Sequence, residues 1–419
     1  MEYIKRHIEN VIERSAAGFK AVLLTGARQT GKSTLLKHLF SDRKYVTLDD
    51  PFLEEQARNE GAMFLQLNSP PVTIDEVQRA PELFRYIKLA CDAAKEKGLF
   101  CLSGSQQFSL MKNVSESLAG RIAVVELAGL SLREIQNDSF NAVFVPNEKY
   151  VISRAKTAVQ PKNIWEIIHR GSYPELQNGA VGWAEFYGSY VKTYIERDVR
   201  ELPAVQDLDA FRRFLTAAAS RTGEILNYTK LANDVGKDVK TIKNWLSALE
   251  ASGVVYLLEP YRNTALNRVI KSPKLYFRDT GLVCYLTRWL TPETLAYGSF
   301  SGHVFETFAV SEILKSYSNA GMDSKFYVSY FHPTDKKRVN SDGEIRYAES
   351  EIDLIIENGG TLYPVEIKQS GRAVSADAEA FDMLKKANGA KIGNGAVICS
   401  CPQPGRVAEN VWQLPVWYI

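Results

Sequence analysis

The stretch "AVLLTGARQTGKSTLLKHLF", residues 21–40, decides the fold of the first part of this chain. Residues 21–24 form a continuous apolar run, which is typical of a strand buried on both faces of a parallel sheet. From Leu35 onward leucines recur at helical spacing, so we expect a helix that begins near Lys32. A strand, a glycine-containing loop and a helix in this order predict an α/β domain.

The loop between strand and helix reads G-x-x-x-x-G-K-S, and this spacing predicts a phosphate site. Glycines let the backbone curl so that successive N–H groups converge on a phosphate at the positive end of the helix. The lysine would reach the β- and γ-phosphates, and the serine hydroxyl would complete a Mg²⁺ shell. The residues expected to bind the nucleotide are Gly26, Arg28, Gln29, Thr30, Gly31, Lys32, Ser33 and Thr34.

A second short apolar strand, "PPVTIDEVQ" (residues 70–78), ends in two acids. Asp75 is placed to hold magnesium, together with Ser33. Glu76 is placed to polarise the water that attacks the γ-phosphate. Downstream of the glycine loop, this pair predicts hydrolysis of the nucleotide as well as binding.

Two further residues are candidates for the same reaction. Ser105 follows the strand in "GLFCLSGSQQF" (residues 98–108), where it would sense the γ-phosphate, although a plain cap after a strand explains it equally. Arg121 would neutralise transition-state charge, in its own chain or from a neighbouring subunit, and an ordinary surface arginine is the alternative.

The middle of the chain is predicted to be helical. "WAEFYGSYVKTYIERDVRELPAV" (residues 183–205) predicts a long amphipathic helix broken near Pro203. Its charged residues Glu196, Arg197 and Asp198 suit either a solvated, salt-bridged face or a contact with the nucleotide.

Residues 225–263 show the helix start and stop signals of a winged helix-turn-helix. A short helix over 229–235 meets Gly236, a second helix starts after the N-cap Asp238, and an apolar strand follows. Lys240 and Lys243 lie away from the apolar seam, where they would meet DNA phosphates. Such units also bind proteins, and the sequence leaves both partners open.

Four residues of the last part have a shared chemistry. Glu306 lies on a predicted helix, Asp353 on a strand, and Glu366 and Lys368 on the same face of the next strand. Acids beside apolar residues cost free energy unless a cation compensates. Glu306, Asp353 and Glu366 would supply oxygen ligands to a divalent metal, and Lys368 would act on the phosphate or water. A hairpin with a Glu–Lys pair is the alternative.

The whole chain resembles a widespread prokaryotic group of AAA-type P-loop ATPases. The match is carried by "GARQTGKST", "TIDEVQRAP", "LSGSQQFSLMKNVSESLAGR", "YIERDVREL", "YFRDTGL" and "EIDLIIE…YPVEIKQS". The resemblance implies ATP and Mg²⁺ as cofactors, a central winged helix, and a C-terminal domain related to PD-(D/E)xK nucleases. Ile352 stands where that nuclease family often has a proline.

The expected fold class is therefore α/β multidomain: a P-loop parallel sheet flanked by helices, a helical lid, a winged helix and a restriction-endonuclease-like domain. The predicted boundaries are 1–140 for the ATPase domain, 141–205 for the lid, 206–265 for the winged helix, 266–300 for a connector and 301–419 for the nuclease-like domain. A chain of 419 residues has room for several cores.

The composition indicates an ordinary globular protein and gives no information on its binding partner. Hydrophobic residues make up 45% and charged residues 24%, as in ordinary globular proteins. Five scattered cysteines predict a reducing cytoplasm, and no apolar run predicts a membrane span. The charged residues 1–20 predict a surface helix and not a signal peptide.

We expect an ATP hydrolase that acts on DNA through its winged helix and nuclease-like domain, in the cytoplasm. The alternative is an ATP-dependent switch that binds a protein or DNA partner and cuts nothing. A homo-oligomer is one option for the assembly, and a role of Arg121 toward a neighbouring subunit would require it.

Overall fold

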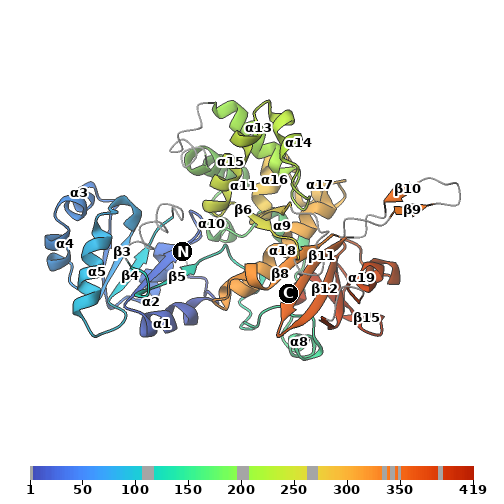
Figure 1. The fold of residues 1–419 in the computed structure, drawn as a ribbon, viewed down its shortest axis with the longest axis horizontal. Coiled ribbons are helices and arrows are strands. Elements are labelled where there is room, and N and C mark those ends of the chain that lie inside the picture. The colour runs from blue at the N-terminus through green and yellow to red at the C-terminus, as the bar shows by residue number, and fades with distance from the viewer. Residues whose placement is uncertain are drawn as a thin grey trace.

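The computed structural model describes residues 3–105, 118–195, 207–261, 272–332, 337–339, 345–347, 351–385 and 390–419. Three parts follow one another along the chain (Figure 1): an α/β unit drawn in blue, a group of helices in green and yellow, and a mixed sheet in orange and red. The long helix α18 (Ser301–Asn319) lies between the first and the last part.

The first part is built on a parallel sheet of five strands in the order β2-β3-β4-β1-β5. Every neighbouring pair is parallel, and Thr25 at the end of β1 lies beside Glu126 at the end of β5. The strands are β1 (Ala21–Thr25), β2 (Lys44–Thr47), β3 (Val72–Asp75), β4 (Phe100–Ser103) and β5 (Ile122–Glu126). The loops that follow β1, β3 and β4 therefore meet at one edge.

Helices cover both faces of this sheet because its side chains alternate. Ala21 and Leu23 belong to one buried cluster, whereas Val22 and Leu24 belong to the other. The covering helices are α1 (Glu9–Gly18), α2 (Lys32–Leu39), α3 (Pro51–Asn59), α4 (Gly61–Leu67) and α5 (Leu83–Ala93), with a 3-10 turn η1 (Val77–Arg79) after β3. The expected surface helix of residues 1–20 begins only at Glu9, and Ile12 on its inner face is fully buried.

The described residues of the middle part form short helices and an antiparallel strand pair. The helices are α7 (Leu132–Ile135), α8 (Glu148–Arg154), α9 (Ile164–Arg170), α10 (Pro174–Gln177), α11 (Trp183–Tyr190), α13 (Leu208–Ala219), α14 (Tyr228–Val235), α15 (Val239–Ala251), α16 (Thr280–Leu286) and α17 (Pro292–Ala296). The strands β6 (Val255–Leu258) and β7 (Lys274–Phe277) pair with each other.

Two sequence predictions for this part have different outcomes. The side chain of Asp238 caps α15 and Gly236 ends α14 in a left-handed conformation, as predicted. The helix expected from 183 is an α-helix to Tyr190 and continues as a π-helix, η2 (Val191–Ile195), and the break expected near Pro203 stays a prediction because that residue lies outside the described ones. The charged residues Glu196, Arg197 and Asp198 lie outside the described residues.

The last part is a mixed sheet preceded by α18. Its path is β15-β16-β14-β12-β11-β8, with β13 beside β12. The predicted strands of residues 350–371 form an antiparallel pair, turning at Gly359 and Gly360, both with positive φ. The strands of the sheet are β8 (Val328–Phe331), β11 (Ile352–Asn358), β12 (Thr361–Ile367), β13 (Lys391–Ile392), β14 (Gly395–Cys399), β15 (Gly405–Ala408) and β16 (Val411–Pro415). The strands β9 (Lys337–Val339) and β10 (Ile345–Tyr347) form a separate pair. The helix α19 (Asp382–Lys385) and the 3-10 turns η3 (Ser324–Phe326), η4 (Ser375–Phe381) and η5 (Val416–Tyr418) complete this part.

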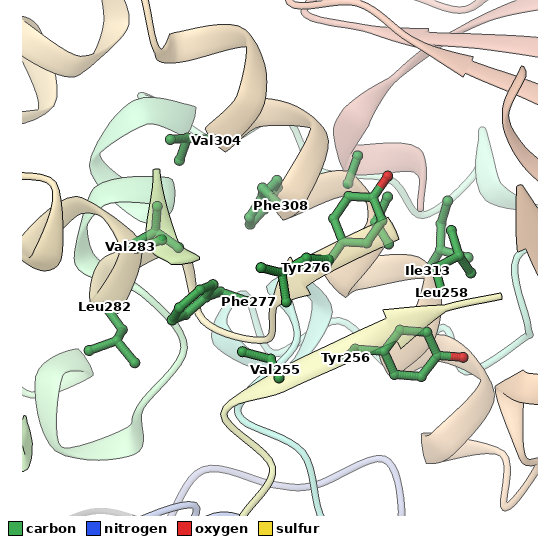
Figure 2. Packing of buried hydrophobic residues seen from close by; sticks show 14 of the residues in the cluster. Val255, Tyr256, Leu258, Tyr276, Phe277, Leu282, Val283, Val304, Phe308 and Ile313 are labelled. Carbon is green, nitrogen blue, oxygen red and sulfur yellow. The ribbon is translucent and has the colours of Figure 1, made fainter. Parts of the chain in front are cut away.

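The middle and last parts share one hydrophobic core. Figure 2 shows Tyr276 and Phe277 of β7 beside Phe308 of α18, within a cluster that includes residues of both parts. Because this core is continuous, the β6–β7 pair is fixed to α18 by packing. Among the described residues, no helix is both long and apolar enough to cross a bilayer.

Candidate functional site

The loop after β1 has the backbone shape that a phosphate site needs. Gly26, Gly31 and Gln29 have φ values of 140°, 91° and 63°. A Cβ at Gly26 would lie 2.2 Å from the carbonyl oxygen of Leu127, so only glycine fits there. Gly31 is the N-cap of α2, which brings the loop to the positive end of that helix.

Lys32 is folded over this loop. Its Nζ donates hydrogen bonds to the carbonyl oxygens of Gly26 (3.0 Å) and Ala27 (2.9 Å), and the residue is only 6% exposed. Thr30 Oγ1 also donates to the Ala27 carbonyl, at 2.9 Å. The ammonium group of Lys32 therefore lies at the loop, in reach of a phosphate bound there.

Asp75 gathers three hydroxyl groups at the end of β3. Ser33 Oγ donates to Asp75 Oδ2 at 2.7 Å, and Tyr45 OH donates to the same oxygen. Ser103 Oγ of β4 donates to Oδ1. The serine and the aspartate predicted to share a Mg²⁺ ion are therefore in contact, and both present oxygen atoms that suit this ion.

Glu76 lies beside Asp75 with a left-handed backbone, φ 56°. Its Oε2 accepts a hydrogen bond of 3.3 Å from Ser105 Oγ and another from Gln78 Nε2. Ser105 is therefore beside the carboxylate that is predicted to activate water. The sequence did not identify Gln78.

Arg121 lies at the amino ends of the strands, opposite to the phosphate loop. Ile122, the next residue, pairs with Ala21 at the amino end of β1, whereas the phosphate loop follows the carboxyl end. Arg121 Nε forms an ion pair with Asp92 at the surface. Arg121 is therefore not among the side chains around the loop of its own chain, and a role toward a neighbouring subunit stays a prediction.

A cavity of about 610 Å³ opens next to the loop. Gln29, Thr30, Gly31 and Thr34 line one side of it. The other walls come from the first described residues, which the sequence did not connect with the nucleotide, and from α10 and α11, which lie in the predicted lid: Tyr3, Ile4, Arg6, Pro174, Glu175, Glu185, Phe186 and Tyr190. This space is large enough for the nucleoside part of a nucleotide.

Arg6 and Glu134 form a buried ion pair that stabilises the phosphate loop. Arg6 donates through Nε to Glu134 (3.1 Å) and through Nη1 to the Thr30 carbonyl oxygen (2.9 Å). Glu134 also accepts from the backbone amides of His7 and Ser131. Burial opposes the charge of Glu134, yet these partners hold the pKa of its carboxyl below the ordinary value.

The loop also touches the middle part of the chain. A Cβ at Gly253, just after α15, would lie 3.3 Å from the Ala27 amide nitrogen. Arg278, which follows β7, forms an ion pair with Glu126 at the end of β5. The phosphate loop and the end of α15 are thus in direct contact.

The next residue, Asp279, organises the start of α16. Its carboxylate accepts hydrogen bonds from the Ser172 amide, from Tyr187 OH at 2.7 Å and from the Leu282 amide at 2.8 Å. The "RDTGL" stretch therefore joins α9, α11 and α16, which explains its charged residues structurally.

Lys240 and Lys243 lie on the exposed face of α15. The apolar face packs inward through Ile242, Leu246 and Leu249. Lys243 Nζ is 5.2 Å from the centre of the Tyr228 ring. Both lysines are therefore accessible to a partner.

A buried cluster of charges forms where α18 and β11 meet β7. Lys274 Nζ lies 3.3 Å from Glu306 Oε1 and 3.4 Å from Asp353 Oδ1, and it also pairs with Glu351. Tyr276 OH donates to Glu306 Oε1 at 2.6 Å. The sequence prediction grouped Glu306 with Asp353 but missed Lys274, the residue that joins them.

Glu366 and Lys368 form a second pair on β12 and just beyond its end. Lys368 Nζ donates to Glu366 Oε1 at 2.7 Å, whereas Glu366 Oε2 is buried and has no hydrogen-bond partner in the described part of the chain. No group of three or more His, Cys, Asp or Glu side chains among the described residues is arranged to hold a metal ion. The metal role of Glu306, Asp353 and Glu366 therefore stays a prediction.

Electrostatics in this cluster follow from its burial. Burial, and then the charge of Asp353, raises the pKa of the Glu306 and Glu366 carboxyls above the ordinary range. For Lys274, burial works against the charge, but Tyr276 and the surrounding carboxylates raise the pKa of its ammonium. The carboxylates around Lys274 therefore favour the charged form of its ammonium.

Comparison with known proteins identifies the first part of the chain. Residues 18–136 match a family described as "AAA domain". Residues 161–293 and 301–419 match two domains of unknown function, DUF8612 and DUF4143. The first match contains every residue predicted to bind the nucleotide, and the first part is an AAA-type P-loop ATPase domain, as predicted.

Two relatives extend the likeness along most of the chain. The uncharacterized proteins Rv2008c of Mycobacterium tuberculosis and Mb2031c of Mycobacterium bovis are each 27% identical over 355 residues, which cover 83% of this chain and 70% of theirs.

Similar solved structures are more distant. The Walker-type ATPase PABY2304 of Pyrococcus abyssi has 13% identity and a TM-score of 0.42, covering 68% of this chain and 96% of that one. A RuvB variant of Thermotoga maritima has 18% identity and a TM-score of 0.29, covering 60% and 86%. AMPPCP-bound DnaA from Aquifex aeolicus has 13% identity and a TM-score of 0.27, covering 58% and 85%.

Proposed function

We propose that this chain is a Mg²⁺-dependent ATP hydrolase that acts on DNA. ATP hydrolysis by its AAA domain supplies the free energy for this action. The observation that carries the proposal is the contact between Ser33 and Asp75 (2.7 Å), with Glu76 as the next residue along the chain. In this arrangement Lys32 binds the β- and γ-phosphates and Glu76 orients the attacking water. Magnesium, held by Ser33 and Asp75, would neutralise phosphate charge.

The unit α13–α14–α15–β6–β7 supports action on DNA. Three helices followed by an antiparallel strand pair is the order of a winged helix, and the isolated bridge between Ile225 and Lys274 adds a further strand position. Lys240 and Lys243 are exposed on its α15. Basic residues on the exposed face of such a helix suit phosphate contacts.

The C-terminal part supports a nuclease-like fold. A helix, α18, precedes three antiparallel strands, β8, β11 and β12, and a parallel strand, β14, follows. The carboxylates of the predicted set lie on α18, β11 and β12.

A second candidate function is a switch without cleavage, and Lys274 favours it. This lysine already neutralises Glu306 and Asp353, which a metal-dependent nuclease would need for its ions. In this second function ATP changes how the chain binds its partner, and no bond in that partner is broken.

Fluorescence anisotropy with duplex DNA tests the proposed function. We expect Lys240→Ala/Lys243→Ala to weaken binding and to lower the slope of log K against log salt by about two, one for each lost phosphate contact. Lys95→Ala/Lys97→Ala, which removes two exposed lysines of the AAA domain, is the matched control. Equal DNA affinity in both double variants would exclude a DNA contact by Lys240 and Lys243.

A further inference from the structure

The cation in the C-terminal cluster comes from another part of the chain. Lys274 is the first residue of β7 in the middle part, 79 residues before Asp353, and it is 3% exposed. Its ammonium group faces carboxylates of α18 and β11, and of Glu351 next to β11. The rings of Tyr276 and Tyr330 lie 6.0 Å and 5.9 Å from it.

The carboxylate oxygens around Lys274 are already in use. Asp353 Oδ2 accepts the Ile367 amide at 2.9 Å, so Oδ1, which faces Lys274, is its remaining oxygen. Glu306 Oε1 accepts from both Tyr276 OH and Lys274. A divalent ion bound between Asp353 and Glu306 would therefore need the place of the lysine ammonium, and the residues as they stand do not fit that ion.

The strand that carries Lys274 is anchored on both sides. Leu275 exchanges backbone hydrogen bonds with Gly223 (2.7 Å) and Glu224 (3.0 Å), and β7 pairs with β6. Beyond β6, Tyr261 donates to the Tyr330 carbonyl at 2.7 Å, which joins the strand pair to β8. Figure 2 shows that Tyr276 and Phe277 pack near α18. Lys274 is thus held in place by the backbone on which it lies.

We propose that Lys274 is a tethered cation that takes the place of a divalent metal, so that docking of the β6–β7 pair closes the carboxylate pair Glu306 and Asp353 to metal ions. The strand pair belongs to the unit that carries α15, so the same contact fixes that unit to the C-terminal sheet. Removal of the ammonium would leave Asp353 Oδ1 and Glu306 Oε1 without their cation, and a divalent ion in its place would favour the ionised form of both carboxyls. The site would then bind a divalent cation. This inference does not depend on ATP turnover or on DNA binding.

Mn²⁺ binding to the full chain without nucleotide, followed by electron paramagnetic resonance, tests the proposal. We expect Lys274→Met to bind one Mn²⁺ ion at least about tenfold more tightly than the wild type, because an adjacent positive charge is gone. Adding Asp353→Asn to this variant should abolish the gain. Lys315→Met is the matched control: it removes another buried lysine, paired with Glu312 at 2.8 Å, without freeing the cluster.

Lys274→Met leaves several carboxylates without their cation, so its folding is checked by circular dichroism. The double variant Lys274→Met/Glu351→Gln removes one positive and one negative charge together. It replaces Lys274→Met in the Mn²⁺ measurement if the single variant does not fold. Equal Mn²⁺ affinity in the wild type and in either folded variant overturns the proposal. So does a gain of the same size in Lys315→Met, or a gain that survives Asp353→Asn. None of these outcomes bears on ATP hydrolysis or DNA affinity, so failure here is distinct from failure of the proposed function.

Discussion

Ser33 of the phosphate loop and Asp75 of β3 are joined by a hydrogen bond of 2.7 Å. Ser33 lies at the start of α2, which follows β1, and β4 separates β1 from β3 in the sheet, so the parallel register brings the two residues together. The contact places the nucleotide-binding loop and the acidic pair in a single site, on which the first two predictions depend.

Lys32→Ala should abolish ATP turnover, because the γ-phosphate loses the cation closest to the loop. Lys37→Ala on the same helix removes an exposed lysine and should leave turnover unchanged. Phosphate release measured with both variants decides the matter. Turnover that persists in Lys32→Ala would refute the phosphate-loop assignment.

Glu76→Gln should keep ATP binding and lower hydrolysis by roughly a hundredfold or more, since the amide cannot accept the proton of the attacking water. Calorimetry measures the affinity, and phosphate release measures the rate. Glu82→Gln, at an exposed position, is the control. A normal rate in Glu76→Gln would remove Glu76 as the base.

Plasmid nicking with Mg²⁺ or Mn²⁺ separates the two candidate functions. With Lys274 in place, the wild type should nick no more plasmid than Asp353→Ala, with or without ATP. Metal-dependent nicking by the wild type that disappears in Asp353→Ala would establish the nuclease instead.

Glu134→Gln should destabilise the fold by about 3 kcal/mol near neutral pH, because Arg6 loses its buried partner. The pKa of Glu134 is lower in the folded chain, so the carboxylate contributes stability above its unfolded pKa and loses it as the pH falls through its folded pKa. The difference from the wild type should therefore shrink between neutral pH and an acid pH below the ordinary carboxyl range. Urea unfolding at both pH values measures it, with the exposed Glu13→Gln as control, and a difference independent of pH contradicts the assignment.

The first domain could be predicted from local patterns because its chemistry follows strand ends. Residues 26–34 are contiguous, and Asp75 and Glu76 directly follow a buried strand, so their meeting point is fixed once the strands are parallel. The same rule explains Arg121: a residue just before a strand lies at the edge opposite to the loops that follow strands. Its place away from the phosphate loop could therefore have been derived from the sequence.

Lys274 and Arg6 could not be predicted in this way. Each meets its partner across a long separation, 79 residues from Lys274 to Asp353 and 128 from Arg6 to Glu134. Such contacts depend on how whole units dock, which no local periodicity describes. The one available signal for Lys274 is a lysine at the start of the otherwise apolar run "LYF", a position where a charge needs a partner.

The close approach of Gly253 to Ala27 has a thermodynamic consequence. The gap between them does not hold even one added methyl group without crowding, at 3.3 Å from the Ala27 amide. A shift of Ala27 toward Gly253 when a triphosphate enters would displace the end of α15 or be resisted by it. Such a displacement would link the affinity for ATP reciprocally to the affinity of α15 for its ligand, and each affinity can be measured while the other ligand is titrated.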